Sequence, residues 1–239
     1  MARNTLHKAS PNVPDFTTRW STIKDSVRRR VPQVVKDVYR LFVPRSMQEA
    51  FTDVYQRNDW DVGSGRGSTP DNTVEYRKLI ERFIHTHEIK SVIDIGCGDW
   101  QFSRLIEWGD VEYLGIDTVP AVVEANRKRF GPRYRFECRD VTNDKLPPTD
   151  LLLMKDVLQH WPNSAIQTFL PRLKNYRFAI LTNDGCPSPR LNTEIRMTGY
   201  RPLDLRQPPF SVAMEELLRY RTDEVQREQW NKLVLLYRS

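Results

Sequence analysis

Two glycines and a carboxylate are spaced as a binding site for a nucleotide-like ligand requires. The apolar run Val92–Ile95 leads directly into Gly96 and Gly98. Glycine lets the chain turn tightly and lets backbone N–H groups approach a ligand closely. The next apolar run ends at Asp117, where a carboxylate can accept hydrogen bonds from both ribose hydroxyls of an adenosine group. This order of residues predicts a site for an adenosine-containing cofactor.

A third strand-like run ends at Asp140, whose carboxylate could accept from an adenine amino group while Val141 offers its backbone N–H. The structural alternative is a glycine turn that only joins a strand to a helix and binds no ligand. A dinucleotide site needs a third glycine for close packing at the pyrophosphate, and this chain has Gln101 at that position. The pattern therefore argues against NAD or FAD.

Strand-like and helical runs alternate around these residues. Five strands are predicted at Ser91–Ile95, Glu112–Ile116, Tyr134–Cys138, Leu151–Met154 and Phe178–Leu181. Helices are predicted between them at Gln101–Trp108, Ala121–Arg129 and Ser164–Asn175. Alternation of this kind predicts a parallel sheet covered by helices on both faces.

The pattern changes before and after these five strands. Thr69 and Pro70 predict the start of an earlier helix. The buried stripe of that helix is predicted to be Val74, Leu79, Ile80 and Phe83. After the fifth strand, Leu217–Arg221 and Lys232–Tyr237 are joined by a polar connection too short for a crossover helix, which predicts an antiparallel hairpin. The expected fold is α/β, with a Rossmann-like seven-stranded sheet that is mostly parallel and ends in this hairpin.

The stretch from Ser91 to Asp184 resembles a class I, or Rossmann-like, S-adenosylmethionine-dependent methyltransferase domain. The resemblance implies cofactor contacts from Asp94, Gly96, Cys97 and Gly98 at the methionine end, Asp117 at the ribose, and Asp140 and Val141 at the adenine. More narrowly, the segments GSGRGS after Trp60, GCGDWQFS, KDVLQHW and TGYRPLDL resemble a bacterial methyltransferase group associated with surface-glycan gene neighbourhoods.

The segment 155–161, KDVLQHW, follows the fourth predicted strand, at the edge of the sheet where a methyl acceptor would bind. Methyl transfer to a hydroxyl benefits from a base, and histidine titrates near neutrality, so His160 is the first catalytic candidate. The alternative is a histidine that packs under the loop or shapes the pocket. Lys155 and Asp156 are further candidates, which could pair, orient the amino group of the cofactor or position the substrate.

A divalent-metal site is a further hypothesis for this edge. Asp156 follows the fourth strand, and Asn183 and Asp184 follow the fifth, so three oxygen ligands for Mg²⁺ could meet. The resemblance extends to divalent-metal-dependent catechol and sugar O-methyltransferases. The alternative is a turn, because Asn-Asp-Gly is common in turns.

Residues 55–70 form a Gly/Ser-rich loop that we interpret as a lid, although an ordinary linker has the same composition. Trp60 could stack on the substrate or the adenine, and Ser68 is counted among the cofactor contacts. Trp161, Tyr200 and Arg201 are the candidate acceptor contacts. For Arg201, surface salt-bridging is the alternative.

The basic character of the chain is concentrated at one end. Residues 1–45 hold ten Lys and Arg against three Asp and Glu, whereas the other residues hold 27 against 28. A nucleic-acid surface usually spreads positive charge over a whole domain, so RNA or DNA binding is not favoured. Three scattered cysteines fit a reducing compartment, and the cytoplasm is expected.

We predict three segments: a mobile tail at 1–18, a basic helical extension at 19–54, and a methyltransferase domain at 55–239. Residues 20–42 combine an apolar stripe with basic residues, which favours either packing on the domain or peripheral contact with the inner membrane surface. Nothing in the sequence indicates an oligomeric state.

Methylation of a hydroxyl on a glycan or another small polar acceptor is the leading functional hypothesis, with S-adenosylmethionine as cofactor. RNA or protein methylation that uses the basic arm is the first alternative. A catalytically inactive binding module with the same fold is the second.

Overall fold

The computed structural model describes residues 46–222 and 231–239. The predicted tail 1–18, the part of the predicted extension up to residue 45 and the proposed membrane-contacting segment 20–42 lie outside the described residues, as does the connection 223–230. Among the described residues, no helix combines the length and apolar character needed to cross a membrane.

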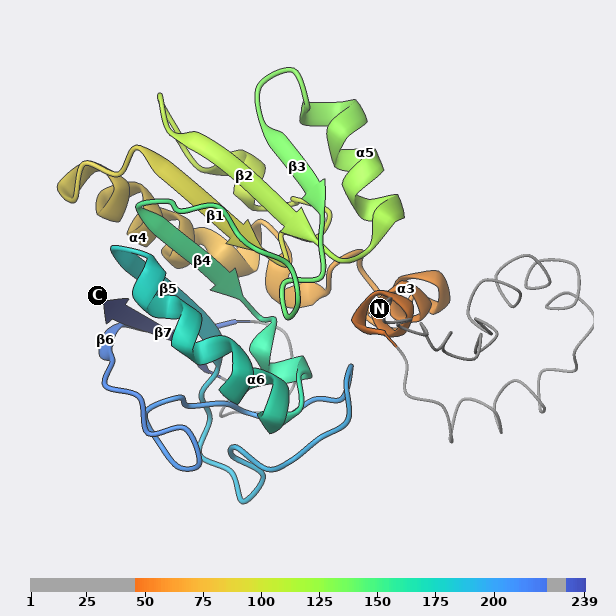
Figure 1. Ribbon diagram of the computed structural model, residues 1–239, viewed down its shortest axis with the longest axis vertical. Coiled ribbons are helices and arrows are strands. Elements are labelled where there is room, and N and C mark those ends of the chain that lie inside the picture. The colour runs from red at the N-terminus through yellow and green to blue at the C-terminus, as the bar shows by residue number, and fades with distance from the viewer. Residues whose placement is uncertain (1–45, 223–230) are drawn as a thin grey trace, which may run out of the picture. The chain divides into compact units, whose positions relative to one another are not determined.

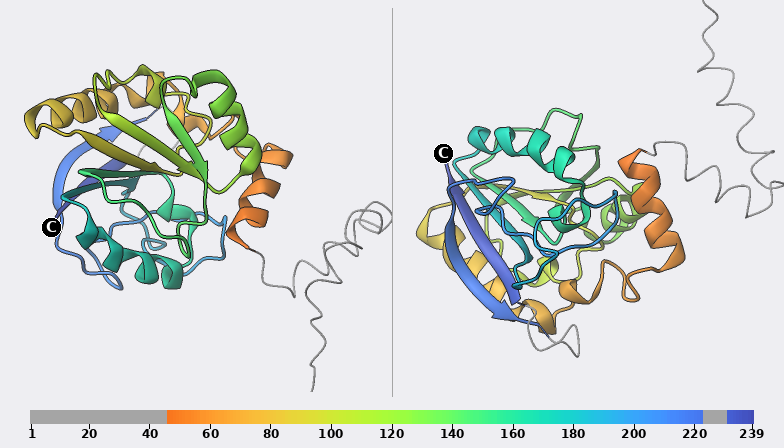
Figure 2. Two further views of the ribbon diagram at one scale, coloured as in Figure 1. Left: turned by 45° about the horizontal axis from the view of Figure 1, so that its top comes forward. Right: turned by 90° about the horizontal axis from the view of Figure 1, so that it is seen from below.

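Seven strands form one mixed sheet (Figure 1). They are β1 Ser91–Ile95, β2 Glu112–Asp117, β3 Arg135–Cys138, β4 Leu151–Lys155, β5 Phe178–Asp184, β6 Glu215–Arg221 and β7 Asn231–Arg238. The order across the sheet is β3-β2-β1-β4-β5-β7-β6, with β7 and β6 at the edge opposite β3 (Figure 2). The first five strands are parallel, and β7 is antiparallel to both of its neighbours. The predicted Rossmann-like fold with an antiparallel terminal hairpin is confirmed.

The strand order reverses direction at β1, because β2 and β3 lie on one side of it and β4 and β5 on the other. In open parallel sheets, a crevice forms at such a point, beyond the carboxyl ends of the strands. The topology therefore places the ends of β1, β2 and β4, which carry most of the predicted site residues, at one crevice.

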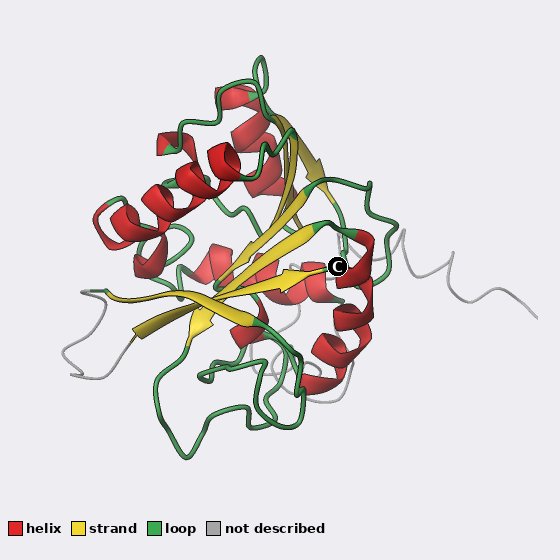
Figure 3. Ribbon diagram, turned by 90° about the vertical axis from the view of Figure 1, so that its left-hand side faces the viewer, coloured by secondary structure: helices red, strands yellow, loops and turns green. Residues whose placement is uncertain are grey.

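Helices cover both faces of the sheet (Figure 3). They are α3 Met47–Arg57, α4 Val74–Thr86, α5 Pro120–Phe130 and α6 Asn163–Phe169. Side chains alternate between the two faces along each strand, so Val92 packs in the same core as α4, whereas Ile93 packs in the other core with α3 and α6. Both cores are buried, which fixes the register of the central strands.

The predicted helix Gln101–Trp108 is wrong, since only a 3₁₀ turn forms there, at Ser103–Leu105. Trp100 has a left-handed backbone (φ 59°), which interrupts a continuous helix after the glycine turn. The two indoles of this segment are buried, with Trp100 Nε1 donating to the Tyr113 hydroxyl and Trp108 Nε1 to the Ser103 carbonyl. The chain therefore follows the course that buries both indoles and gives each indole N–H a hydrogen-bond acceptor, instead of forming a helix.

The predicted start of α4 at Thr69 and Pro70 is also wrong. Thr69 Oγ1 donates to the Arg66 carbonyl, which closes the preceding 3₁₀ turn, and α4 begins at Val74. Val74 is exposed, and Tyr76 takes its predicted place in the buried stripe. The helix predicted for Ser164–Asn175 is α6 followed by a 3₁₀ turn, Leu170–Asn175, that contains a proline at its start.

The predicted domain boundary between residues 54 and 55 falls inside α3. This helix begins at an N-cap that the prediction overlooked, in which Ser46 Oγ accepts the backbone N–H of Glu49 at 3.2 Å. Met47 and Phe51 pack in the same core as the sheet, and the compact unit that contains the sheet begins at Ser46. The helix therefore belongs to the domain rather than to an extension.

Candidate active site

The glycine turn after β1 cannot accommodate a side chain at either of its two glycines. Gly96 (φ 70°) and Gly98 (φ 55°) both lie in the left-handed region. A Cβ on Gly96 would lie 2.4 Å from Val157 Cγ2, and a Cβ on Gly98 would lie 2.2 Å from Ser64 Oγ. The turn therefore needs glycine both for its backbone conformation and for the close approach of two other segments.

Asp117, the last residue of β2, holds this turn in place. Its Oδ2 accepts the Gly98 N–H at 3.0 Å, and its Oδ1 accepts the Val119 N–H at 2.9 Å. Burial raises the pKa of the Asp117 carboxyl to about 6. Two backbone donors fix the carboxylate, and each oxygen keeps a second lone pair that a ribose hydroxyl can use.

Asp94 lies inside β1, with its carboxylate at the same crevice. Its Oδ2 accepts hydrogen bonds from the Tyr113 hydroxyl at 2.6 Å and the Ser103 hydroxyl at 3.3 Å. The Tyr113 hydroxyl in turn accepts from Trp100 Nε1. Burial raises the pKa of Asp94 to about 6 despite these donors. The residue is thus oriented by its neighbours as well as available to a ligand.

The region predicted for adenine differs from expectation at Asp140. Its carboxylate accepts the backbone N–H and the hydroxyl of Thr142 and the side-chain amide of Asn143, so it caps its own loop and does not line the cavity. Val141 does line the cavity, as predicted, and so does Arg139, which the prediction did not include. Aspartate at a turn commonly accepts hydrogen bonds from the residues that follow it, so the sequence already offered this alternative for Asp140.

The Gly/Ser loop lies against the glycine turn. Ser64 Oγ accepts the Asp99 N–H at 2.7 Å and shares a 2.8 Å hydrogen bond with the Tyr55 hydroxyl. The carbonyl of Gly67 accepts from Lys155 Nζ at 2.7 Å. The loop therefore joins α3 to the ends of β1 and β4.

Trp60 in this loop lies beside the predicted catalytic edge. Its ring centroid is 5.5 Å from that of His160 and 5.3 Å from that of Tyr55. This places the indole between α3 and His160.

These segments enclose a cavity of about 350 Å³. Pockets for small ligands fall in the range of roughly 300–1,000 Å³. The predicted residues that line it are Trp60, Ser68, Asp94, Gly96, Cys97, Gly98, Asp117, Val141, Lys155, Asp156, His160, Trp161, Asp184 and Tyr200. Three predicted residues, Asp140, Asn183 and Arg201, are not part of its lining.

His160 is held in a defined tautomer. Its Nδ1 lies 2.9 Å from the Gly199 carbonyl oxygen, which can only accept, so Nδ1 carries the proton and Nε2 is the basic nitrogen. Burial lowers the pKa of His160, so the ring is neutral at neutral pH. The imidazole therefore has the protonation state that a general base requires.

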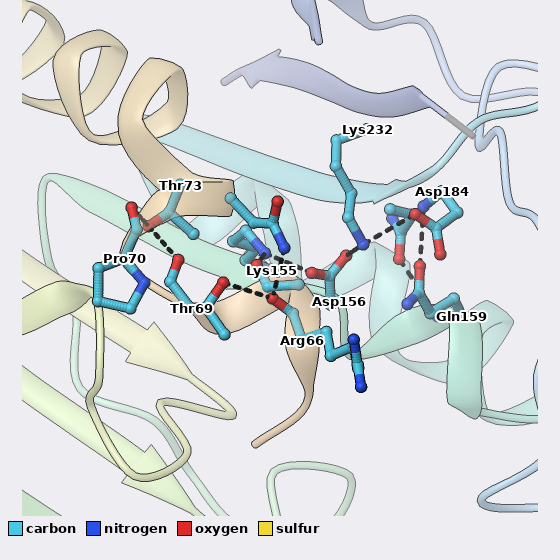
Figure 4. Close-up of polar contacts among 12 residues, drawn as sticks. Arg66, Thr69, Pro70, Thr73, Lys155, Asp156, Gln159, Asp184 and Lys232 are labelled. Carbon is cyan, nitrogen blue, oxygen red and sulfur yellow. Dashed lines mark hydrogen bonds and ion pairs between the residues drawn. The ribbon is translucent and has the colours of Figure 1, made fainter. Parts of the chain in front are cut away.

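Lys155 and Asp156 form an ion pair, one of the three roles considered for them, within a larger buried cluster that includes Lys232 of β7 and Asp184 of β5 (Figure 4). Lys232 Nζ lies 3.0 Å from Asp156 Oδ1 and 2.8 Å from Asp184 Oδ1. The two lysines hold the pKa of Asp156 below its usual value, although burial alone would raise it. All four side chains are therefore held in ion pairs.

The predicted Mg²⁺ site does not form. The Lys232 ammonium lies between Asp156 and Asp184, and Asn183 Oδ1 accepts the Gln159 N–H at 3.2 Å. Within residues 46–222 and 231–239, no group of three or more His, Cys, Asp or Glu side chains is arranged to hold a metal ion. Asn183 and Asp184 are strand residues rather than a turn, because β5 extends further than predicted.

The predicted role of Arg201 in acceptor binding is wrong. Its side chain is fully buried, and its guanidinium donates to the carbonyls of Leu158 and Trp161 and to Asn163 Oδ1. Arg201 therefore stabilises the turn that carries His160 through hydrogen bonds made inside the protein, away from the cavity. Trp161 and Tyr200 do line the cavity, and the Trp161 indole N–H has no hydrogen-bond partner among the described residues.

The sequence-based prediction missed several groups at the site. Lys232, Gln159 and Thr118 line the cavity, and so do Phe51 and Tyr55 of α3. A lysine at the start of the otherwise apolar strand KLVLLY was an available signal for Lys232.

The sheet and the cavity define a protein of the methyltransferase class. A family model of the O-methyltransferase domain matches residues 20–181, and the chain belongs to this family. The predicted methyltransferase class is confirmed by this match. The narrower resemblance to a glycan-associated group stays a prediction.

Two curated relatives are both trans-aconitate 2-methyltransferases. The protein from Methylobacterium nodulans is 28% identical over 169 residues, which cover 69% of this chain and 62% of that protein. The protein from Methylobacterium radiotolerans is 41% identical over 132 residues, which cover 53% of this chain and 47% of that protein. The chain thus spans less than two thirds of either relative.

Solved structures share the fold at low sequence identity. The N-methyltransferase NodS from Bradyrhizobium japonicum, in complex with S-adenosylhomocysteine, is 14% identical, with a TM-score of 0.60 over 81% of this chain and 99% of that chain. Magnesium protoporphyrin IX methyltransferase from Synechocystis, with bound S-adenosylmethionine, is 15% identical, with a TM-score of 0.56 over 82% and 99%. These similarities support the methyltransferase fold.

We predict that Gly98→Ala destabilises the protein more than Gly109→Ala does. Both glycines have φ of 55°, so both variants incur the left-handed penalty, but a Cβ on Gly109 meets no atom within 4 Å. At Gly98 the new methyl displaces Ser64 and its hydrogen bonds, which adds about 1–3 kcal/mol to the loss. Urea unfolding measures the difference, and equal losses would contradict the steric argument.

We predict that Arg201→Met lowers stability by about 2–5 kcal/mol, because it leaves buried carbonyls without their donor. Arg190→Met is the matched control, since the exposed Arg190 also donates to a carbonyl, that of Tyr200. Its loss should stay within about 0.5 kcal/mol. Unchanged stability of Arg201→Met together with a raised KM for the acceptor would instead restore the acceptor-binding role.

Proposed function

We propose that this protein is an S-adenosylmethionine-dependent O-methyltransferase that acts on a hydroxyl of a glycan or another small polar acceptor. The observation that carries the proposal is the geometry of His160. Its Nδ1 is committed to the Gly199 carbonyl, so a basic Nε2 is left on a residue that lines the same cavity as the glycine turn. A hydroxyl acceptor needs such a base.

The chain offers a suitable binding face for the cofactor, which supplies an electrophilic methyl group on a sulfonium when bound. The turn at Gly96 and Gly98 lets the methionine end approach the backbone, and Asp117 can accept the ribose hydroxyls. The Thr118 hydroxyl next to Asp117 is buried and has no hydrogen-bond partner among the described residues. An orphaned buried hydroxyl in the cavity wall supports a polar ligand at this end.

The residues around His160 suit a ring-bearing acceptor. Trp60 and Tyr200 both lie near it, with ring centroids 5.5 Å and 5.9 Å from the imidazole. His160 Nε2 takes the proton of the acceptor hydroxyl, and the nearby carboxylates of Asp156 and Asp184 favour the imidazolium that results. Aromatic side chains also exclude water from the transfer.

Methylation of a carboxylate is the second candidate function. It is favoured by the 41% identity to a trans-aconitate 2-methyltransferase, whose name gives a tricarboxylic acid as the acceptor. A carboxylate is already ionised at neutral pH and needs no base. The two candidates therefore differ in their dependence on His160.

We predict that His160→Gln lowers kcat for a hydroxyl acceptor by about 10²–10⁴-fold, because the amide cannot take the proton. The measurement is transfer of labelled methyl to a panel of sugars, and to trans-aconitate as the carboxylate probe. S-Adenosylhomocysteine affinity should not change, since His160 lies on the acceptor side. Full activity of the variant on trans-aconitate, with no transfer to any sugar, would replace the hydroxyl proposal by the carboxylate one.

We predict that S-adenosylhomocysteine binding weakens as the pH falls through about 6. Burial places the pKa of Asp94 and Asp117 near 6, and the bound nucleoside needs an ionised Asp117 as acceptor. Binding at lower pH must release a proton, which reduces affinity about tenfold per pH unit for each proton released.

Calorimetry across pH 5–8 in buffers of different ionisation enthalpy measures this proton release. Asp117→Asn should bind weakly and with a flatter pH dependence, whereas the exposed Asp110→Asn should behave like the unaltered protein. No binding at millimolar ligand at any pH would contradict the cofactor assignment itself.

A further inference from the structure

Lys232 is a buried lysine that joins two strands at the acceptor side of the cavity. It lies directly opposite Asp184 in the antiparallel register of β7 and β5. Its side chain is 2% exposed, and its ammonium reaches between Asp184 and Asp156, the residue that follows β4 (Figure 4). One cation therefore ties together the ends of β4 and β5.

The charges of this cluster balance. Asp156 pairs with Lys155 as well as with Lys232, and Asp184 pairs with Lys232, so two ammonium groups face two carboxylates. Carboxylates in a protein interior are costly unless a cation accompanies them. A divalent metal ion can neutralise two such carboxylates. In this protein the ammonium group of Lys232, a residue of β7, neutralises them instead.

The cluster also reaches the residues that face the acceptor. Asp184 Oδ2 accepts from the Tyr200 hydroxyl at 2.9 Å, and the Tyr200 ring lies 5.9 Å from the His160 ring. The Asp184 N–H donates to Gln159 Oε1 at 2.8 Å, next to His160 in the chain. A shift of Asp184 would therefore displace both Tyr200 and the turn that carries His160.

We propose that Lys232 is a positioning residue whose ammonium takes the place of a divalent cation between Asp156 and Asp184 and so fixes Tyr200 and His160 for the acceptor. Only the kinetic part of this inference rests on the proposed methyl transfer. Two consequences follow: methyl transfer needs no divalent metal, and removal of the ammonium uncovers a divalent-cation site.

The test compares Lys232→Met with the unaltered chain and with Lys78→Met, which removes an exposed lysine paired with Glu75. Each protein is treated with EDTA, dialysed and titrated with Ca²⁺ and Mg²⁺ by calorimetry, and its melting temperature is measured with and without each ion. Lys232→Met should bind Ca²⁺ and melt several degrees higher in its presence. The unaltered chain and Lys78→Met should do neither.

A second variant, Lys232→Met/Asp184→Asn, removes one carboxylate together with the ammonium. It should fold without a divalent cation and bind none, which ties the cation site to Asp184. In the kinetic arm, Lys232→Met without metal should lower kcat about 10²-fold, the expected effect of a misplaced catalytic group, with S-adenosylhomocysteine affinity unchanged.

Several outcomes would overturn the proposal. These are Mg²⁺ binding by the unaltered chain that Asp156→Asn abolishes, loss of its transfer activity in EDTA with recovery in Mg²⁺, or a folded Lys232→Met that binds no cation. If Lys232→Met folds only with Ca²⁺, the proposal stands, and if it folds neither with nor without Ca²⁺, it falls. Absence of S-adenosylhomocysteine binding by the unaltered chain would refute the proposed function, while the cation titrations would still decide the role of Lys232.

Discussion

The carboxylate of Asp117 accepts two backbone N–H groups, from Gly98 and Val119, and most of the cavity depends on this clamp. It joins the end of β2 to the glycine turn on one side and to the start of α5 on the other. Asp99 of the glycine turn donates its N–H to Ser64 of the Gly/Ser loop. Ser64 also shares a hydrogen bond with Tyr55, which joins the loop to α3. A single buried carboxylate thus sets the positions of three segments that are distant in the sequence.

The cavity buries four aspartates, and the fold stabilises them in two different ways. Asp94 and Asp117 are stabilised by neutral donors, hydroxyl and backbone N–H groups, which do not offset burial, so their pKa values rise to about 6. Asp156 is stabilised by two lysines, which lower its pKa, and Asp184 shares one of them. The half of the cavity near the glycine turn therefore responds to mildly acidic pH, whereas in the half near His160 the carboxylates are held in ion pairs with lysines.

Features set by neighbouring residues could be predicted from the sequence. All seven strands, the glycine turn and Asp117 were predicted, because apolar runs and glycines act locally. The Lys232–Asp184 pair was missed, since it depends on the register of β5 with β7, and both strands extend beyond the predicted bounds. The helix predicted at Gln101–Trp108 failed for a related reason, because the burial of two indoles in the tertiary structure outweighed local helical periodicity.

The insertion of β7 between β5 and β6 has a consequence for the order in which the site is assembled. The last strand of the sheet along the chain is also the one that pairs with β5, so during synthesis the five parallel strands emerge before their neighbour exists. Until β7 docks, the edge of β5 is unpaired and Asp184 lacks its counterion. Formation of the Lys232–Asp184 pair is thus a late, long-range folding event, and partly synthesised chains expose an unpaired strand edge that is prone to aggregation.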